Sequence, residues 1–167
     1  MRSAVLLLTA AVVLVLVNYS IWQREALISG GRTVLLELAP VDPRSLMQGD
    51  YMALRFKVAN DAFPFGQTKG LKDGRMVLAV DSRGIATFRR FSNDANLAAD
   101  EVLIRYRIRN GEPKFATNAF FFQEKQGEYY REAKYGDFRV APDGETILVA
   151  LRGADLQTLG PKTGAAR

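Results

Sequence analysis

The stretch VLIRYRIRNG, residues 102–111, decides the fold class. Its apolar residues alternate with arginines, a period of two that is typical of a β-strand with one buried face. Asn110 and Gly111 follow, a dipeptide that favours the tight turn of a β-hairpin. The strand is therefore expected to pair with the next apolar segment, PKFATNAFFF at residues 113–122.

Two further hairpins are predicted on either side of this one. The segment at 75–91 has two apolar runs around DSRG, and the segment at 137–153 has two runs around PDG; both centres have turn composition. Upstream, TVLLEL at 33–38 and YMALRFKV at 51–58 predict single strands. Hairpins at such short spacing predict a mainly β, antiparallel domain with a barrel-like or sandwich architecture.

Only one segment suits a short helix, GEYYREAKYG at 127–136, which a glycine ends. The segment at 59–74 is rich in Gly, Asn and Asp, and predicts a long loop that can hold a helical turn. In the Phe triplet at 120–122, alternation would expose Phe121 if its neighbours are buried. Burial of both faces is therefore expected, preferably against the short helix and otherwise against a partner.

The N-terminus predicts a membrane helix. Residues 4–22 carry no charge, about the length of roughly 20 residues that crosses the hydrocarbon core. Tyr19 and Trp22 stand where interfacial aromatics are expected. We expect an uncleaved signal-anchor that contacts the lipid bilayer through residues 4–22. A cleaved signal peptide is the alternative, but the following residues lack a clean Ala-x-Ala cleavage pattern.

The charges beside this segment predict its orientation. Arg2 lies on one side, whereas Arg24 is offset by Glu25 on the other, and the N-terminal flank is too short to hold a domain. The expected location is the bacterial inner membrane, single pass, with the C-terminal domain in the periplasm or outside. The expected organisation is an anchor with a short linker at 1–28, a β-rich extracytoplasmic domain at 29–160 and a flexible tail at 161–167.

The composition limits the catalytic and metal-binding chemistry that the chain can carry. The chain has neither cysteine nor histidine, which excludes disulfides and removes the commonest general base and metal ligand. The acidic segment at 92–101 lacks the glycine and spacing of a calcium loop, so a solvated loop is expected there. We expect no metal and no cofactor. The net charge of +5 favours an acidic neighbour, but an exported domain meets little nucleic acid.

Arginines follow the two strands at the centre of the sequence. Arg105, Arg107 and Arg109 share one face of their strand, and Arg89 and Arg90 end a strand that could be its neighbour. If both strands belong to one sheet, these five side chains form a basic patch for an anionic membrane. The alternative is a solvent-facing strand whose charges protect a sheet edge.

A Gly-Asp-Tyr step precedes the strand at 51–58, and it resembles the signature of the bacterial GDYXXLXY family. The lead-in APVDPRSLMQGDYMALRF, the middle hairpin and the aromatic segment at 120–140 are also similar to that family. One position departs, because a phenylalanine stands where the motif has its last tyrosine. The candidate interaction residues are Arg44, Gly49, Asp50, Tyr51, Leu54 and Phe56.

These motif residues allow three interpretations. In the structural one, Gly49 supplies a backbone conformation barred to other residues, Asp50 accepts backbone N–H groups and Tyr51 packs on the sheet. In the second, Arg44, Asp50 and Tyr51 form a recognition surface. The third makes Asp50 catalytic, although acid–base work usually needs a second titratable group.

The resemblance implies a small membrane-anchored protein of a family with no established activity, often encoded beside multi-span membrane proteins. We therefore expect a non-enzymatic accessory or interaction subunit of a multi-span membrane protein. One alternative is a binder or sensor of an anionic envelope ligand, either lipid or cell-wall polymer. Another is a serine–lysine hydrolase of the signal-peptidase type, with Ser20 as nucleophile and a buried Lys57 as base, but no Ser-Met-Pro context surrounds Ser20.

Overall fold

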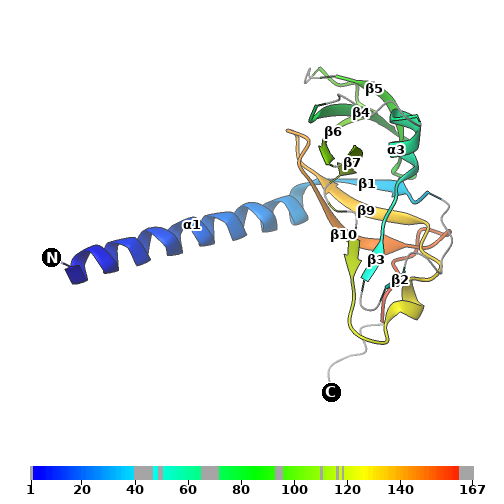
Figure 1. The fold of residues 1–167 in the computed structure, drawn as a ribbon. Helices are drawn as coiled ribbons and strands as arrows, with labels where there is room; N and C mark the ends of the chain where they lie inside the picture. Colours follow the sequence, from blue (N-terminus) through cyan, green and yellow to red (C-terminus); the bar gives the residue numbers. More distant parts are fainter. Residues whose placement is uncertain are drawn as a thin grey trace.

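A long helix projects from a β-rich head (Figure 1). A computed structural model describes residues 2–39, 47–48, 51–64, 72–92, 96–109, 111–115, 117 and 119–161. The predicted site residues Arg44, Gly49 and Asp50 lie outside the described residues, as does the predicted tail after Pro161. The helix, α1, spans Arg2–Gly30.

The head is built on a seven-stranded sheet with the order β10-β9-β1-β5-β4-β6-β7. Its strands are β1 (Arg32–Glu37), β4 (Gly74–Val80), β5 (Ile85–Phe91), β6 (Glu101–Arg109), β7 (Glu112–Phe115), β9 (Tyr135–Val140) and β10 (Thr146–Arg152). The three predicted hairpins are the antiparallel pairs β4–β5, β6–β7 and β9–β10. β1 joins the halves, because it pairs in parallel with β5 and antiparallel with β9.

The sheet curls until it is nearly closed. At the β9–β10 turn, the carbonyl of Gly144 accepts a hydrogen bond from the backbone N–H of Arg105 on β6, at 2.9 Å. This contact brings strands from opposite halves of the sheet together around one apolar interior. The prediction of a mainly β, barrel-like domain behind one N-terminal helix is confirmed (Figure 1).

Aromatic rings fill the centre of this interior. Phe56 is 1% exposed and meets Phe138 and Phe115 edge-to-face, with ring centroids 5.4 and 6.4 Å apart. Aromatic pairs in this geometry contribute about 0.5–1.5 kcal/mol beyond their buried area. The core is thus organised around a residue of the predicted motif.

The predicted strand at 51–58 is wrong in its second half. Strand β3 is only Tyr51–Ala53, and helix α3 spans Lys57–Ala62. Val58 and Ala62 are both buried and stand four residues apart, so they share one face of the helix. The apolar alternation up to Val58 was therefore ambiguous. Val58 is buried as part of the helix, and a strand would have buried it too.

A second, three-stranded sheet has the order β2-β3-β8, with β2 at Met47–Gln48 and β8 at Ala119–Phe121. The predicted partner of the 102–109 strand is therefore divided: its first half forms β7 and its end pairs with β3. The predicted helix at 127–136 is only the 3-10 turn η1, Gly127–Tyr130, because β9 already begins at Tyr135.

The Phe triplet is covered on one face only. Phe120 and Phe122 pack against Tyr130 of η1, with ring centroids 4.9 and 5.6 Å apart. Phe121 points away and is 74% exposed. The short helical turn does cover this segment as predicted, but the expected burial of both faces is wrong.

Candidate interaction surface at the base of the helix

Helix α1 is long and apolar enough to cross a membrane. The candidate span is Ala4–Gly30, and none of its most apolar window is buried in the protein. Tyr19 and Trp22 lie at the end of the apolar run, 55% and 63% exposed. Such side chains are typical of a membrane–water interface, so the helix fits a single-pass anchor.

The end of α1 is fastened to the head. Leu27 is 9% exposed and lies where the helix contacts β9 and β10. At Gly31 a side chain would place its Cβ 2.5 Å from the Leu27 carbonyl oxygen and 3.0 Å from Cβ of Arg139 on β9. A glycine at this position therefore lets the chain turn from the helix into β1 in close contact with the sheet.

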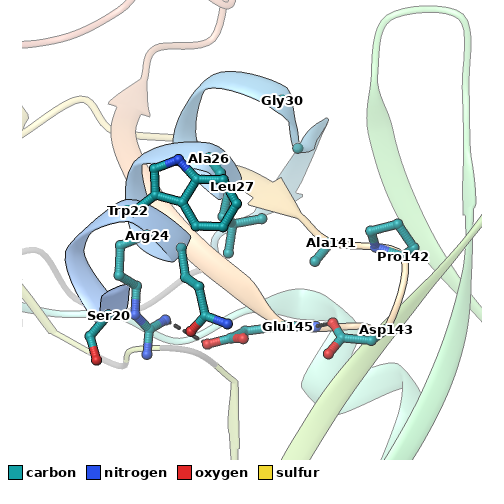
Figure 2. A pocket seen from close by; sticks show the side chains of 12 residues that line it. Ser20, Trp22, Arg24, Ala26, Leu27, Gly30, Ala141, Pro142, Asp143 and Glu145 are labelled. Carbon is teal, nitrogen blue, oxygen red and sulfur yellow. Dashed lines mark hydrogen bonds and ion pairs between the residues drawn. The ribbon is translucent and has the colours of Figure 1, made fainter. Parts of the chain in front are cut away.

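A cleft of about 450 Å³ separates the last turns of α1 from the β9–β10 turn (Figure 2). Trp22, Ala26 and Leu27 supply apolar lining from the helix, and Pro142 lies on the opposite wall. Figure 2 also shows Arg24 reaching across to Glu145, and their ion pair measures 2.5 Å. The cleft therefore combines an apolar wall with a charged rim, close to the predicted membrane surface.

A second hollow of about 360 Å³, the basic groove, adjoins this cleft, and the two share Arg24 and Glu145. Most of its lining side chains are cationic: Arg24, Arg105, Arg107, Arg109 and Lys114, with Phe115, Glu145 and Thr146 completing it. Two of the arginines are held by acids outside the groove. Arg105 binds Asp143 at 2.6 Å, and Arg109 binds Asp73 at 2.9 Å.

Arg89 and Arg90 lie on the same sheet as these arginines, since β4 pairs with both β5 and β6. They are held by acids as well. Arg89 binds Asp100 at 3.1 Å, and Arg90 donates to both carboxylate oxygens of Glu101. These hydrogen bonds, together with one from the backbone N–H of Ala98, lower the pKa of Glu101 to about 2. The positive charge of Arg90 is thus matched locally.

The described motif residues divide between core and surface. Leu54 is 2% and Phe56 1% exposed, so both are packing residues of the head. Tyr51 on β3 is half-buried and lies opposite Phe121 in register, with ring centroids 5.8 Å apart. Among the motif residues that the structure describes, the surface is therefore an aromatic pair, Tyr51 with the exposed Phe121.

The family described as GDYXXLXY protein matches residues 13–151. The chain belongs to this family. No curated protein and no solved structure matches it significantly. The matched range begins inside α1 and ends within β10, so the GDYXXLXY pattern covers part of the apolar helix together with nearly all of the head.

In this GDYXXLXY protein the last motif position is Phe56, whose ring is enclosed by other rings. A phenylalanine there needs no hydrogen-bond partner, whereas a buried tyrosine hydroxyl would need one. The change from tyrosine to phenylalanine therefore falls at a packing position. The family motif includes core residues as well as a residue at the surface.

The proposed hydrolase pair does not come together. The hydroxyl of Ser20 donates to the Leu16 carbonyl within α1, at 3.0 Å. Lys57 lies on α3, on the side of the head away from α1 (Figure 1), and binds Glu37 at 3.2 Å. Glu37 raises the pKa of Lys57, whereas a lysine base needs a lowered pKa.

Sequence reasoning missed the groove residues that come from other elements. Arg24 had a signal, because it is the first charge after the apolar run. Lys114 and Glu145 had none, since nothing in the sequence places β7 or the β9–β10 turn beside α1. Within the described ranges, no three acidic side chains gather as a metal site.

Proposed function

We propose that this protein is a non-enzymatic, membrane-anchored accessory subunit that works by contact with a multi-span membrane protein. The observation that carries the proposal is the fastening of α1 to the head by Leu27 and by the Arg24–Glu145 ion pair. A head held at the end of its span turns a constant face towards its neighbours in the membrane plane. A fixed orientation of the head suits contact with a partner subunit. A helix that only tethered a freely moving domain would not need to hold that domain in one orientation.

A polar residue in the apolar span supports a helix partner. The side-chain N–H of Asn18 donates to the Leu14 carbonyl at 2.8 Å. Among the described residues, no donor reaches the side-chain carbonyl oxygen of Asn18. Side-chain amides in a bilayer stabilise helix association by roughly 0.6–2 kcal/mol, so Asn18 is a suitable contact for a neighbouring transmembrane helix.

The head offers an aromatic contact of its own. Phe121 is 74% exposed and leans on Tyr51 of the motif strand. Aromatic side chains are enriched in protein interfaces, where they bury large areas at a small entropic cost. We infer that this pair contacts the extramembrane part of the same partner.

The head is proposed to lie outside the cytoplasm, in the periplasm if the host has one. Arg2 stands before the span, whereas Arg24 after it is offset by Glu25 and bound to Glu145. The positive-inside rule then favours an inner N-terminus.

The test is affinity purification of the full-length chain, tagged at its C-terminus, in a mild detergent. A multi-span membrane protein is expected at a stoichiometric ratio. Asn18→Leu and Phe121→Ser should each reduce its retention, because each removes one proposed contact. Val149→Ser is the matched control, since Val149 is also an exposed apolar residue, 41% accessible on β10. Repeated absence of such a partner, or retention unchanged in both variants, would reject the proposal.

A further inference from the structure

We propose that a hollow at the start of β4 binds one pyranose ring of a glycan, which stacks on Phe91 and forms a hydrogen bond with Tyr106. The hollow measures about 350 Å³, and its lining includes Asp73, Gly74, Phe91, Ser92 and Tyr106. It shares no lining residue with the basic groove or with the cleft beside α1. The inference is independent of the proposed partner contact. It rests on the head lying outside the cytoplasm only for the source of the glycan, which is the cell envelope.

The Tyr106 hydroxyl is a buried polar group without a partner in the described chain. Tyr106 on β6 is 9% exposed, and its ring meets those of Phe63 and Phe91 edge-to-face, with centroids 5.0 and 5.8 Å apart. Within the described ranges, however, its hydroxyl forms no hydrogen bond. Buried tyrosines normally find a partner for this group, and an unsatisfied one costs stability. A ligand hydroxyl that bonds to Tyr106 would remove that cost.

Gly74 keeps the space over this hydroxyl clear. It lies directly opposite Tyr106 in the β4–β6 register, and a Cβ at this position would lie 2.7 Å from the hydroxyl oxygen. Any side chain at residue 74 would therefore collide with the hydroxyl where it now stands. Burial and the nearby Asp73 carboxylate raise the pKa of Tyr106. The hydroxyl therefore stays protonated, and it can donate as well as accept a hydrogen bond.

Phe91, at the end of β5, provides a fixed aromatic platform in the same hollow. It is 46% exposed. Three rings hold it, those of Phe63, Phe88 and Tyr106, with centroids at 5.2, 5.0 and 5.8 Å and planes inclined by 52°, 57° and 66°. None of the three is stacked parallel on it. The face of an aromatic ring carries partial negative charge, which attracts the C–H groups on the flat side of a pyranose. Because the ring is already held in place, binding costs little side-chain entropy.

Asp73 adds a fixed acceptor to the lining. Its Oδ1 accepts hydrogen bonds from the backbone N–H of Ile108 and from Arg109, both at 2.9 Å. Among the described residues, its Oδ2 accepts only from Arg109, at 3.1 Å, so it has capacity for a ligand hydroxyl. The hollow thus combines an apolar ring with a few polar groups, as small-molecule sites do. A pyranose matches this pattern, because it has C–H groups on its faces and hydroxyl groups around its edge, whereas a simple anion would not use the ring.

The test is saturation-transfer difference NMR of the full-length chain, titrated with cellotetraose and with the β-1,4-linked tetramer of N-acetylglucosamine. The chain is kept in an amine oxide detergent, because a detergent with a sugar headgroup would compete. At least one tetramer should bind, with the strongest transfer to the C–H protons on one face of a pyranose. Tyr106→Phe should weaken that binding about fivefold, the contribution of one hydrogen bond. Phe91→Leu should weaken it by about the same factor, because it removes the aromatic face.

Each variant has a matched control outside the hollow. Tyr129→Phe removes an exposed hydroxyl from η1, and Phe121→Leu removes an exposed ring from β8; neither should change binding. Tyr106→Phe keeps the packed ring and breaks no hydrogen bond of the described chain, so its Tm should not fall and a loss of binding cannot come from unfolding.

Three outcomes would overturn the proposal: neither tetramer binds the wild type, Tyr106→Phe binds as tightly as the wild type, or the controls lose as much affinity as the hollow variants. The affinity purification is repeated with Tyr106→Phe, which should retain the membrane partner fully. A failure of glycan binding is therefore distinguishable from a failure of the proposed function.

Discussion

Arg24 and Glu145 lie 121 residues apart in the chain, yet their side chains meet in an ion pair of 2.5 Å. Both side chains are about half exposed, at 58% and 43%. Exposed ion pairs contribute only about 0–1 kcal/mol to stability. The consequence of this pair is therefore geometric, because it joins the last turns of α1 to the turn of the final hairpin.

The buried Leu27 is expected to hold the helix against the head. Leu27→Ser should leave the head folded but loosen its orientation, since it removes the apolar contact with β9 and β10. Spin labels at Val13→Cys and Arg83→Cys suit a chain without native cysteine, and the distance distribution between them should broaden. Ile28→Ser is the control, because Ile28 is 43% exposed. A distribution equally narrow in all three chains would contradict a fastened helix.

Asp137 is expected to be the costliest charge to remove. It is 2% exposed on β9 and binds Arg139 at 2.5 Å and Arg152 at 2.6 Å. Removing one partner of a buried ion pair leaves uncompensated charge and costs about 3–5 kcal/mol. Asp137→Ala should lower the free energy of unfolding in urea by that amount.

The control for this prediction is Asp100→Ala. Asp100 pairs with Arg89, and both side chains are about half exposed, so its loss should cost no more than about 1 kcal/mol. Equal losses in the two variants would mean that Asp137 is not an essential part of the folded state.

The hairpins could be predicted from the sequence because each depends on local information. Residues 104–109 alternate strictly, and the turns DSRG and PDG interrupt apolar runs. The strand at 51–58 failed for a physical reason: Val58 is buried either way, so alternation could not reveal that a helix begins at Lys57. Contacts between segments far apart in the chain could not be predicted. Nothing in the sequence indicates that Arg24 and Lys114 line one groove.

The candidate site was predictable only in part. The arginine face of the 102–109 strand was visible from its period of two. The partial neutralisation of this arginine face could not be predicted. Asp73 and Asp143, which bind Arg109 and Arg105, come from distant loops. The exposed Phe121 was also missed, since its neighbours pack on a helical turn that covers one face only.

Glu101 is expected to make the head sensitive to acid. Its hydrogen bonds from Arg90 hold its pKa at about 2, below the ordinary value of 4.5. A depressed pKa in the folded state stabilises the protein above about pH 4.5, and that contribution is lost as the pH falls towards 2. The Tm difference between the wild type and Glu101→Gln should therefore shrink between pH 5 and 2. A constant difference over that window would show that the pairing does not depend on the ionised carboxylate.

Gly136 is expected to resist enlargement. A Cβ at this position would lie 2.8 Å from Cε2 of Phe138 and 3.2 Å from Cε1 of Phe56. Overpacking of a filled core costs about 1–3 kcal/mol, so Gly136→Ala should lower the unfolding free energy by that amount. Combining it with Phe138→Leu should cost less than the sum of the two single changes, because the smaller side chain makes room. Gly30→Ala, where a Cβ meets nothing within 4 Å, should be close to neutral.

The sidedness of the head can be tested with one introduced cysteine. Arg83 lies exposed in the β4–β5 turn, and the chain has no other thiol. Arg83→Cys should react with a membrane-impermeant maleimide in intact cells if the head is outside the cytoplasm. Met76→Cys, at a position 0% exposed, should react only after denaturation and so reports that the head is folded. Labelling of Arg83→Cys only after lysis would place the head inside, and recovery of a shortened chain in the soluble fraction would mean that α1 is removed as a signal peptide.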